Sequence, residues 1–275
     1  MFRLLNIEFH KLKHSKASKV LIITYFILLT STALIATINF DFAQVQFHLA
    51  EMGVFNFPYI WHLSTYLSSA IKFFLLLVIV SMMANEYSNK TLKQNLIDGL
   101  SKKEFVLSKF YTVIIFSLAS TIFVFFVSLI LGLIYSDFTE IAVIFSDLEY
   151  MLAFFIKLVG FFSFGLFLGI LIKRSAFAIG AMIMWFMFES FIKGMLHWKL
   201  KGSVDFIMQF LPLESMSNLI KEPFTRFSAV KSIAKQIGED LSKDYTVHFF
   251  NIIIVIVWTI IFVYLSYWLL KQRDL

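Results

Sequence analysis

The sequence predicts an all-α, polytopic membrane protein with six transmembrane helices and an N-terminal interfacial elbow helix. Of its 275 residues, 59% are hydrophobic and only 15% are charged, and the mean hydropathy is +0.82. These values lie outside the range of soluble globular proteins. Apolar runs of about 20 residues, the length that crosses a bilayer, recur along the chain. They must be helical, because lipid offers backbone amides no hydrogen-bond partner outside the segment.

Residues 1–19 are predicted to form an amphipathic elbow that lies flat on the membrane surface. Phe2, Leu5, Phe9 and Leu12 recur at helical spacing, and the basic residues fall between them. A frayed basic tail is the alternative. A cleaved signal peptide is disfavoured, since the basic arm is long and the following apolar run exceeds an h-region.

Six segments are long and apolar enough to span the membrane. Three carry no charge and lie at about 20–40, 110–136 and 246–270, and three with isolated charges lie at about 59–84, 150–172 and 175–196. The span at 59–84 contains Lys72. Its twelve strongly apolar side chains contribute roughly −0.3 to −0.6 kcal/mol each, against about +3 kcal/mol for one central Lys, so insertion is favoured.

The distribution of Lys and Arg predicts that both termini are cytoplasmic, in the cytoplasmic membrane of the cell. The N-terminal arm and the gap at 85–109 carry five basic residues each, whereas the gaps at 41–58 and 137–149 carry acids and no Lys or Arg. Basic residues mark the cytoplasmic side of a membrane protein. The formal charge of +6 therefore needs no nucleic-acid partner.

The long gap at 197–245 is predicted to be an outer loop with two short helices. Apolar residues lead from Val204 to Leu211 before Pro212, and a second apolar stripe runs from Phe227 to Leu241. The loop either packs on the bundle as a lid or limits backflow as an exit gate.

Three charged residues inside the predicted spans are candidates for a translocation path: Lys72, Glu189 and Lys193. Lys72 falls near mid-membrane, or near the interface if its span starts later. Glu189 and Lys193 are four residues apart and are expected to neutralise each other, with a proton relay at Glu189 as the alternative. Lys157 is expected to reach the outer interface. No metal site is predicted, because the histidines are dispersed and no H-E-x-x-H motif occurs.

The segment at 85–109 is predicted to be a cytoplasmic helix, a turn and an amphipathic lead-in to the third span. Leu92, Leu96 and Leu100 follow a four-residue step, and Asp98-Gly99 offers the turn. The segment is longer than a return connection between two spans needs, which suggests a surface for a cytoplasmic partner.

The order of residues in this segment resembles the cytoplasmic signature of ABC-2 type transporter permeases. It comprises Glu86, Thr91-Leu92, Leu96, Gly99-Leu100-Ser101-Lys102 and Val106-Leu107-Ser108-Lys109. Members commonly have Gly just before the Thr and Pro near the turn, where this chain has Lys90 and Asp98-Gly99. The resemblance assigns contact with a partner ATPase to Glu86, Thr91, Leu92, Leu96, Gly99, Lys102, Lys103 and Lys109.

This resemblance implies the membrane subunit of a bacterial ABC exporter, with alternating access driven by a separate cytoplasmic ATPase that binds ATP and Mg²⁺. The chain itself would hold no cofactor and catalyse no reaction, and no G-x-x-x-x-G-K-[ST] phosphate loop occurs in it. A second permease, identical or a sister chain, is implied. The alternative is a self-contained, ion-coupled secondary transporter that uses Lys72 and Glu189.

Overall fold

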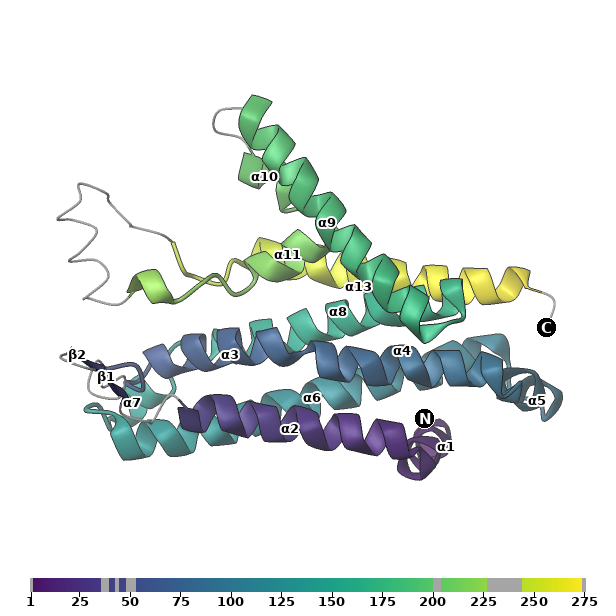
Figure 1. The fold of residues 1–275 in the computed structure, drawn as a ribbon, viewed down its shortest axis with the longest axis horizontal. Helices are drawn as coiled ribbons and strands as arrows, with labels where there is room; N and C mark the ends of the chain where they lie inside the picture. The colour runs from purple at the N-terminus through teal and green to yellow at the C-terminus, as the bar shows by residue number, and fades with distance from the viewer. Residues whose placement is uncertain are drawn as a thin grey trace.

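A computed structural model describes residues 2–35, 40–42, 45–47, 53–199, 204–226 and 244–273 of the chain. The long helices are α2 (Lys16–Ile35), α3 (Tyr59–Ile71), α4 (Phe73–Ser88), α6 (Lys102–Tyr135), α8 (Glu149–Ile172), α9 (Ser175–Lys199) and α13 (Phe249–Gln272). Most of them run side by side along one axis, whereas α9 leans away from the bundle (Figure 1). Among the described residues, five helices are long and apolar enough to span a membrane, and the number rises to six if α3 and α4, which are bent by 43° at their junction, form one span. The predicted all-α polytopic fold is confirmed.

Helix α8 lies at the centre of the bundle. It packs against α4, α6, α9 and α13, and it is apolar on all sides, as a helix surrounded by others should be. Gly165 allows α4 to approach closely, because a Cβ atom there would lie 2.3 Å from Leu76 Cδ1. Small residues at a helix interface permit such a close approach between membrane helices.

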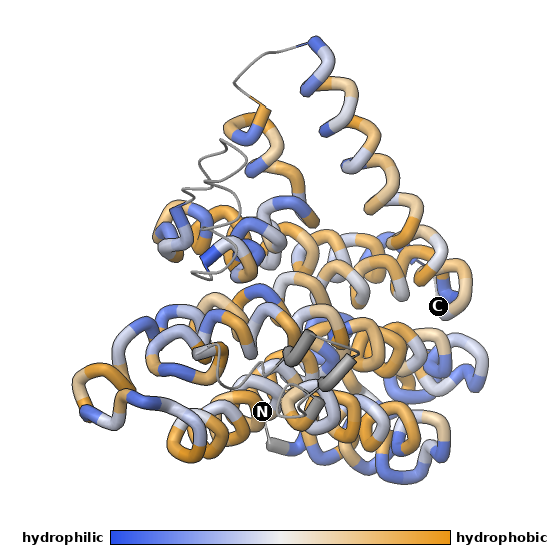
Figure 2. Tube along the Cα trace, turned by 60° about the vertical axis from the view of Figure 1, so that its left-hand side comes forward, coloured by the Kyte–Doolittle hydropathy of each residue, from blue (hydrophilic) through white to orange (hydrophobic). Residues whose placement is uncertain are grey.

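Hydrophobic residues are spread over all the long helices, including the outward-leaning α9 (Figure 2). On α9, Phe186, Phe191 and Trp198 are among the exposed large apolar side chains. Apolar side chains that find no place in the core suit a surface facing lipid or another membrane helix.

The N-terminal helix α1 (Phe2–His14) forms the elbow before α2 and packs on α6. Leu5 and Leu12 are buried against the bundle, and Phe9 is 38% exposed. Glu8 is also buried, because its carboxylate meets a buried lysine of α6, as described below.

The two ends of the bundle differ in character. Short elements gather at one end: strands β1 (Phe40–Phe42) and β2 (Val45–Phe47), which pair as an antiparallel hairpin, and helix α7 (Ile141–Ile144). The other end holds α1, α5 (Thr91–Ile97) and both chain termini (Figure 1). There the Lys102 ammonium donates to the carbonyls of Lys271 and Arg273. We call this end, with its many Lys and Arg, the basic end.

Three further short elements follow α9: helices α10 (Val204–Met208) and α11 (Pro212–Asn218), and the 3₁₀ turn η1 (Phe224–Arg226). The first predicted helix of this loop is observed as the short α10. Helix α11 was not predicted, and Pro212 opens it at a position where the missing N–H costs nothing. The predicted helix from Phe227 to Leu241 lies outside the described residues.

Helix boundaries differ from the predicted spans chiefly around the third one. Helix α6 begins at Lys102 and not near residue 110, because Ser101 and Glu104 form a capping box that starts it early. The predicted lead-in and the predicted third span are therefore one continuous helix of 34 residues.

Candidate functional site

Helix α5 is held at the basic end by two short turns. Lys90 precedes it with a left-handed φ of 55°, and Gly99 follows it with a φ of 93°. Glycine adopts such a φ at no steric cost, so the Asp98-Gly99 turn can reverse the chain into α6. The helix, turn and lead-in predicted for this segment are observed.

A cluster of buried ionic side chains joins α5 to the rest of the bundle. Lys109 of α6 is 0% exposed, and its ammonium lies 2.6 Å from the Glu8 carboxylate and 2.5 Å from that of Glu86. Glu86 also accepts hydrogen bonds from Lys11, at 2.7 Å, and from the Thr91 hydroxyl, at 2.5 Å. We call these five residues the ionic cluster. It links α1, the end of α4, the start of α5 and α6.

The residues assigned to ATPase contact divide into two groups in the structure. Glu86, Thr91 and Lys109 belong to the ionic cluster, and the side chain of Leu92 is buried beside them. Gly99 and Lys103 are exposed, and Leu96 and Lys102 are half-buried. The first group faces the interior of the helix bundle, and the second group lies at or near its surface.

Sequence reasoning missed three residues of this region. Glu8 and Lys11 escaped attention, although Glu8 is the one acid in an otherwise basic arm. Ile97 lies 74% exposed at the end of α5. Its position outside the four-residue step of Leu92, Leu96 and Leu100 was the sequence signal that it faces outward.

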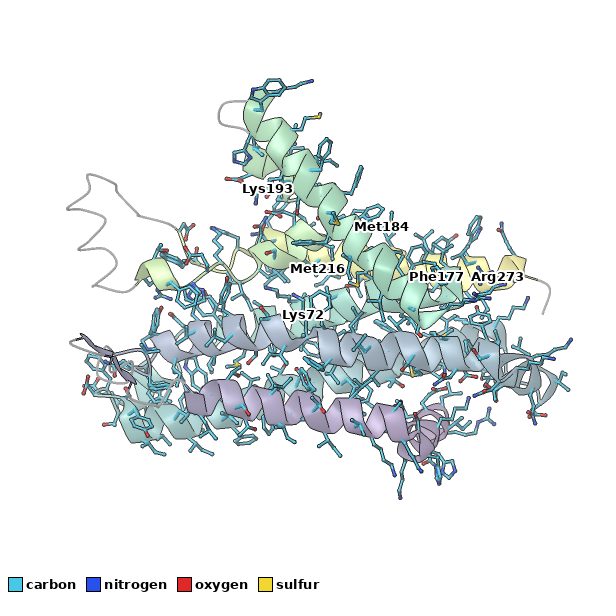
Figure 3. The ribbon with its side chains drawn as sticks, in the orientation of Figure 1. Lys72, Phe177, Met184, Lys193, Met216 and Arg273 are labelled. Atoms are coloured by element: carbon cyan, nitrogen blue, oxygen red, sulfur yellow. The ribbon has the colours of Figure 1, made fainter. Side chains whose placement is uncertain are left out.

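A second polar region lies inside the bundle, at the break between α3 and α4. Lys72 occupies the break, and its ammonium lies 4.6 Å from the centre of the Phe161 ring of α8. A cavity of about 240 Å³ adjoins it, with Lys72 and Met216 on its wall (Figure 3). Glu189 of α9 and Glu214 of α11 also line this cavity, which we call the membrane cavity.

The expected pair between Glu189 and Lys193 does not form. The Glu189 carboxylate instead accepts hydrogen bonds from the Trp185 indole and from the backbone amides of Leu213 and Glu214, at 2.6, 3.1 and 2.8 Å. Lys193 pairs with Glu214 at 2.6 Å. The local prediction was wrong because α11 packs against α9 and supplies both residues with tertiary partners. Glu189 caps the first turn of α11.

The expectation that Lys157 reaches the interface was also wrong. Its side chain lies one helical turn before Phe161 and is only 3% exposed. Within the described part of the chain it has no carboxylate partner, and the ammonium of Lys72 is near enough to interact with it electrostatically.

A larger cavity of about 880 Å³ lies towards the hairpin end, between α9, α11, α13 and the segment after α11. Glu214 and Ser217 line this outer cavity as well as the membrane cavity. The two cavities are therefore neighbours, and the Lys193–Glu214 ion pair lies at their boundary.

The segment after α11 packs on α3 and α8. His62 is stacked on Tyr150, with ring centres 4.2 Å apart, and its Nε2 lies 2.8 Å from the Lys221 carbonyl. The Arg226 guanidinium lies over the rings of Tyr59 and Tyr245. These contacts close the hairpin end of the bundle, and the sequence offered no pattern that predicted them.

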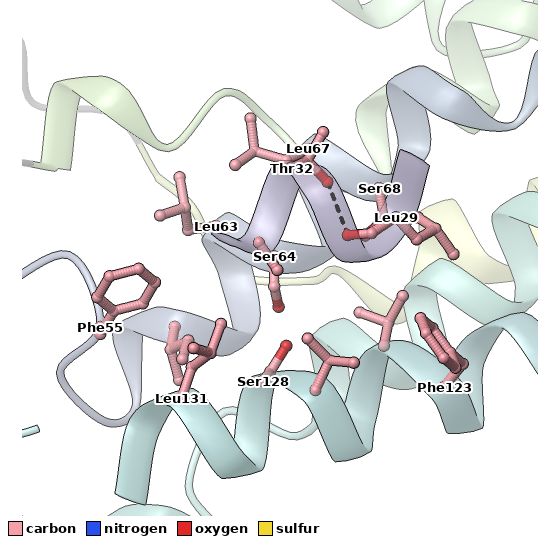
Figure 4. A pocket seen from close by; sticks show the side chains of 14 residues that line it. Leu29, Thr32, Phe55, Leu63, Ser64, Leu67, Ser68, Phe123, Ser128 and Leu131 are labelled. Carbon is pink, nitrogen blue, oxygen red and sulfur yellow. Dashed lines mark hydrogen bonds between the residues drawn. The ribbon is translucent and has the colours of Figure 1, made fainter. Parts of the chain in front are cut away.

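A third cavity, between α2, α3 and α6, is shown in Figure 4. Its volume is about 40 Å³, and its walls are mainly apolar side chains such as Leu29, Leu67 and Phe123, with the Ser128 hydroxyl among them. A space of this size holds a few water molecules at most, so we regard it as a packing gap.

Five helices long enough to cross a membrane, with the bent pair α3–α4 as a candidate sixth span, indicate a multi-pass membrane protein. A family model described as "ABC-2 family transporter protein" matches residues 7–275, and the chain belongs to this family. It is therefore a membrane permease component of an ABC transporter. Comparison with curated proteins gave no significant match.

Proposed function

We propose that the chain is the permease of an exporter in the cytoplasmic membrane, moved by a separate ATPase that binds ATP and Mg²⁺. The observation that carries the proposal is α5, whose outer surface is exposed while its base is fastened to three other helices through the ionic cluster. The basic end would face the cytoplasm, in agreement with the positive-inside rule.

The ATPase would dock on the surface formed by Leu96, Ile97, Gly99, Lys102 and Lys103. Closure of the ATPase would displace α5, and Thr91 and Glu86 would pass this movement to Lys109. Because Lys109 belongs to the 34-residue helix α6, a tilt at the basic end reaches the opposite end of the bundle. Rocking of one bundle against another alternates access to a central path. A second permease, identical or a sister chain, would supply the other bundle.

The translocation path would pass the membrane cavity, with Lys72 on its wall and the Lys193–Glu214 pair at its outer limit. Glu189 would position α11 at this path, since three donors already occupy its carboxylate. The same three hydrogen bonds favour a structural role for Glu189 over the proton relay of an ion-coupled transporter.

Co-purification tests the proposal. The tagged permease is isolated from its native host, and the bound proteins are identified and assayed for ATP hydrolysis. We expect an ATPase with a phosphate-loop motif to accompany the wild type. Ile97→Asp should lower its yield by about tenfold or more, since apolar anchors at an interface centre contribute 2 kcal/mol or above.

Ile141→Asp is the matched control, because Ile141 is 76% exposed at the opposite end of the chain. It should leave the yield of ATPase unchanged. Absence of any ATPase from the wild-type preparation, or equal yields from both variants, would contradict the proposal.

A further inference from the structure

The membrane cavity opens towards the surrounding lipid. Phe73 of α4 and Ile183 and Phe186 of α9 line it, and all three are exposed, Phe186 by 61%. Helix α9 leans away from the bundle on this side (Figure 1). An apolar chain in the bilayer can therefore reach the cavity between α4 and α9 without passing through water.

The charged residues that line the cavity are Lys72, Glu189 and Glu214, and they differ in their partners. Glu214 is paired with Lys193, and Glu189 is occupied by three hydrogen-bond donors. Neither carboxylate forms an ion pair with Lys72, whose ammonium lies over the Phe161 ring. Among the described residues, Lys72 is therefore the charged lining residue that lacks an ionic partner.

An uncompensated ammonium group in an apolar interior is costly unless an anion joins it. We propose that the membrane cavity binds the anionic head of an amphiphile whose apolar tail leaves between α4 and α9. Lys72 would pair with the head, and the Ser217 hydroxyl on the same wall can donate to it. This inference rests on the proposed transport function and adds the class of substrate to it.

The position of the outer cavity agrees with this class of substrate. Glu214 and Ser217 lie on the walls of both cavities, so a charged head that leaves Lys72 next meets Lys193.

Binding to the purified full chain, in nanodiscs of phosphatidylcholine and without any ATPase, tests the proposal. Three fluorescent probes separate the contributions: dansyl-undecanoic acid carries tail and charge, its methyl ester carries the tail alone, and dansylglycine carries the charge alone. We expect the acid to bind and the other two to bind at least about tenfold more weakly, since one charged hydrogen bond changes affinity by that much.

Lys72→Gln should weaken binding of the acid by about tenfold or more, and Lys72→Arg should retain it. Lys271→Gln removes an exposed lysine at the end of α13 and should have no effect. The proposal is overturned if Lys72→Gln binds the acid as tightly as the wild type, or if the ester or dansylglycine matches the acid.

A second measurement leaves Lys72 in place, in case its variants do not fold. The chain contains no cysteine, so Ser190→Cys puts a single thiol on the cavity wall. The acid, but not the ester, should slow its reaction with N-ethylmaleimide. Ala119→Cys, on an exposed position of α6, is the control and should react at the same rate throughout. Equal rates at Ser190→Cys with either probe would contradict the proposal. Neither measurement involves the ATPase. A negative result here would therefore leave the proposed docking of the ATPase on α5 untouched, because co-purification tests that docking independently.

Discussion

The ionic cluster and the membrane cavity both place a lysine inside an apolar bundle, but only the lysine of the ionic cluster is paired with carboxylates. Lys109 lies between two carboxylates at 2.6 and 2.5 Å, whereas the Lys72 ammonium lies over an aromatic ring and forms no ion pair among the described residues. A lysine whose charge is paired with carboxylates holds the helices that carry them in one arrangement. A lysine without a carboxylate partner keeps its charge available for a ligand. We therefore assign transmission of movement to the ionic cluster and substrate binding to the membrane cavity.

The largest effect that tests this comparison should come from Lys109→Met. It leaves Glu8 buried without a cation and Glu86 with Lys11 alone, and breaking a buried pair in this way costs about 3–5 kcal/mol of unfolding free energy. Lys72→Met is the matched control, because it removes a charge that has no partner, and it should leave the stability unchanged or raise it. The thermal unfolding temperatures of the two purified variants provide the measurement. Similar losses in both would remove the distinction between the sites.

A smaller loss is expected for Glu8→Gln. Lys109 retains Glu86, so only one charged hydrogen bond is replaced by a weaker one, at a cost of about 1–3 kcal/mol. A double-mutant cycle with Lys109→Met measures the coupling between the two residues. Additive effects would show that α1 is not held to α6 by this pair.

The smallest of these effects should come from Thr91→Val, which removes the hydroxyl that donates to Glu86. Loss of this bond should cost about 1–2 kcal/mol, because its acceptor is charged. The ATPase should still dock in the Thr91→Val variant, since the exposed surface of α5 is unchanged. We expect less transport for each ATP hydrolysed, measured in vesicles that hold permease and ATPase. Unchanged coupling would remove Thr91 from the transmission route.

The long apolar helices, the N-terminal helix and the turn at Asp98-Gly99 could be predicted from sequence because each depends on local hydropathy, spacing or turn chemistry. The partners of the charged residues could not. Glu8 and Lys109 are 101 positions apart, and no local pattern connects them. Glu189 and Lys193 did satisfy a local pattern, yet α11 offered both of them better partners. The residues predicted to contact an ATPase were therefore named without distinction between Lys109, which is buried, and Lys103, which is exposed.

Photo-crosslinking from α5 in intact cells tests the central claim most directly. A benzoylphenylalanine placed at Ile97 should form an adduct between the permease and a cytoplasmic protein with a phosphate-loop motif. The same group at Ile141 should give no such adduct. A permease that forms no ATPase adduct from Ile97, or that forms it equally from Ile141, would contradict the account.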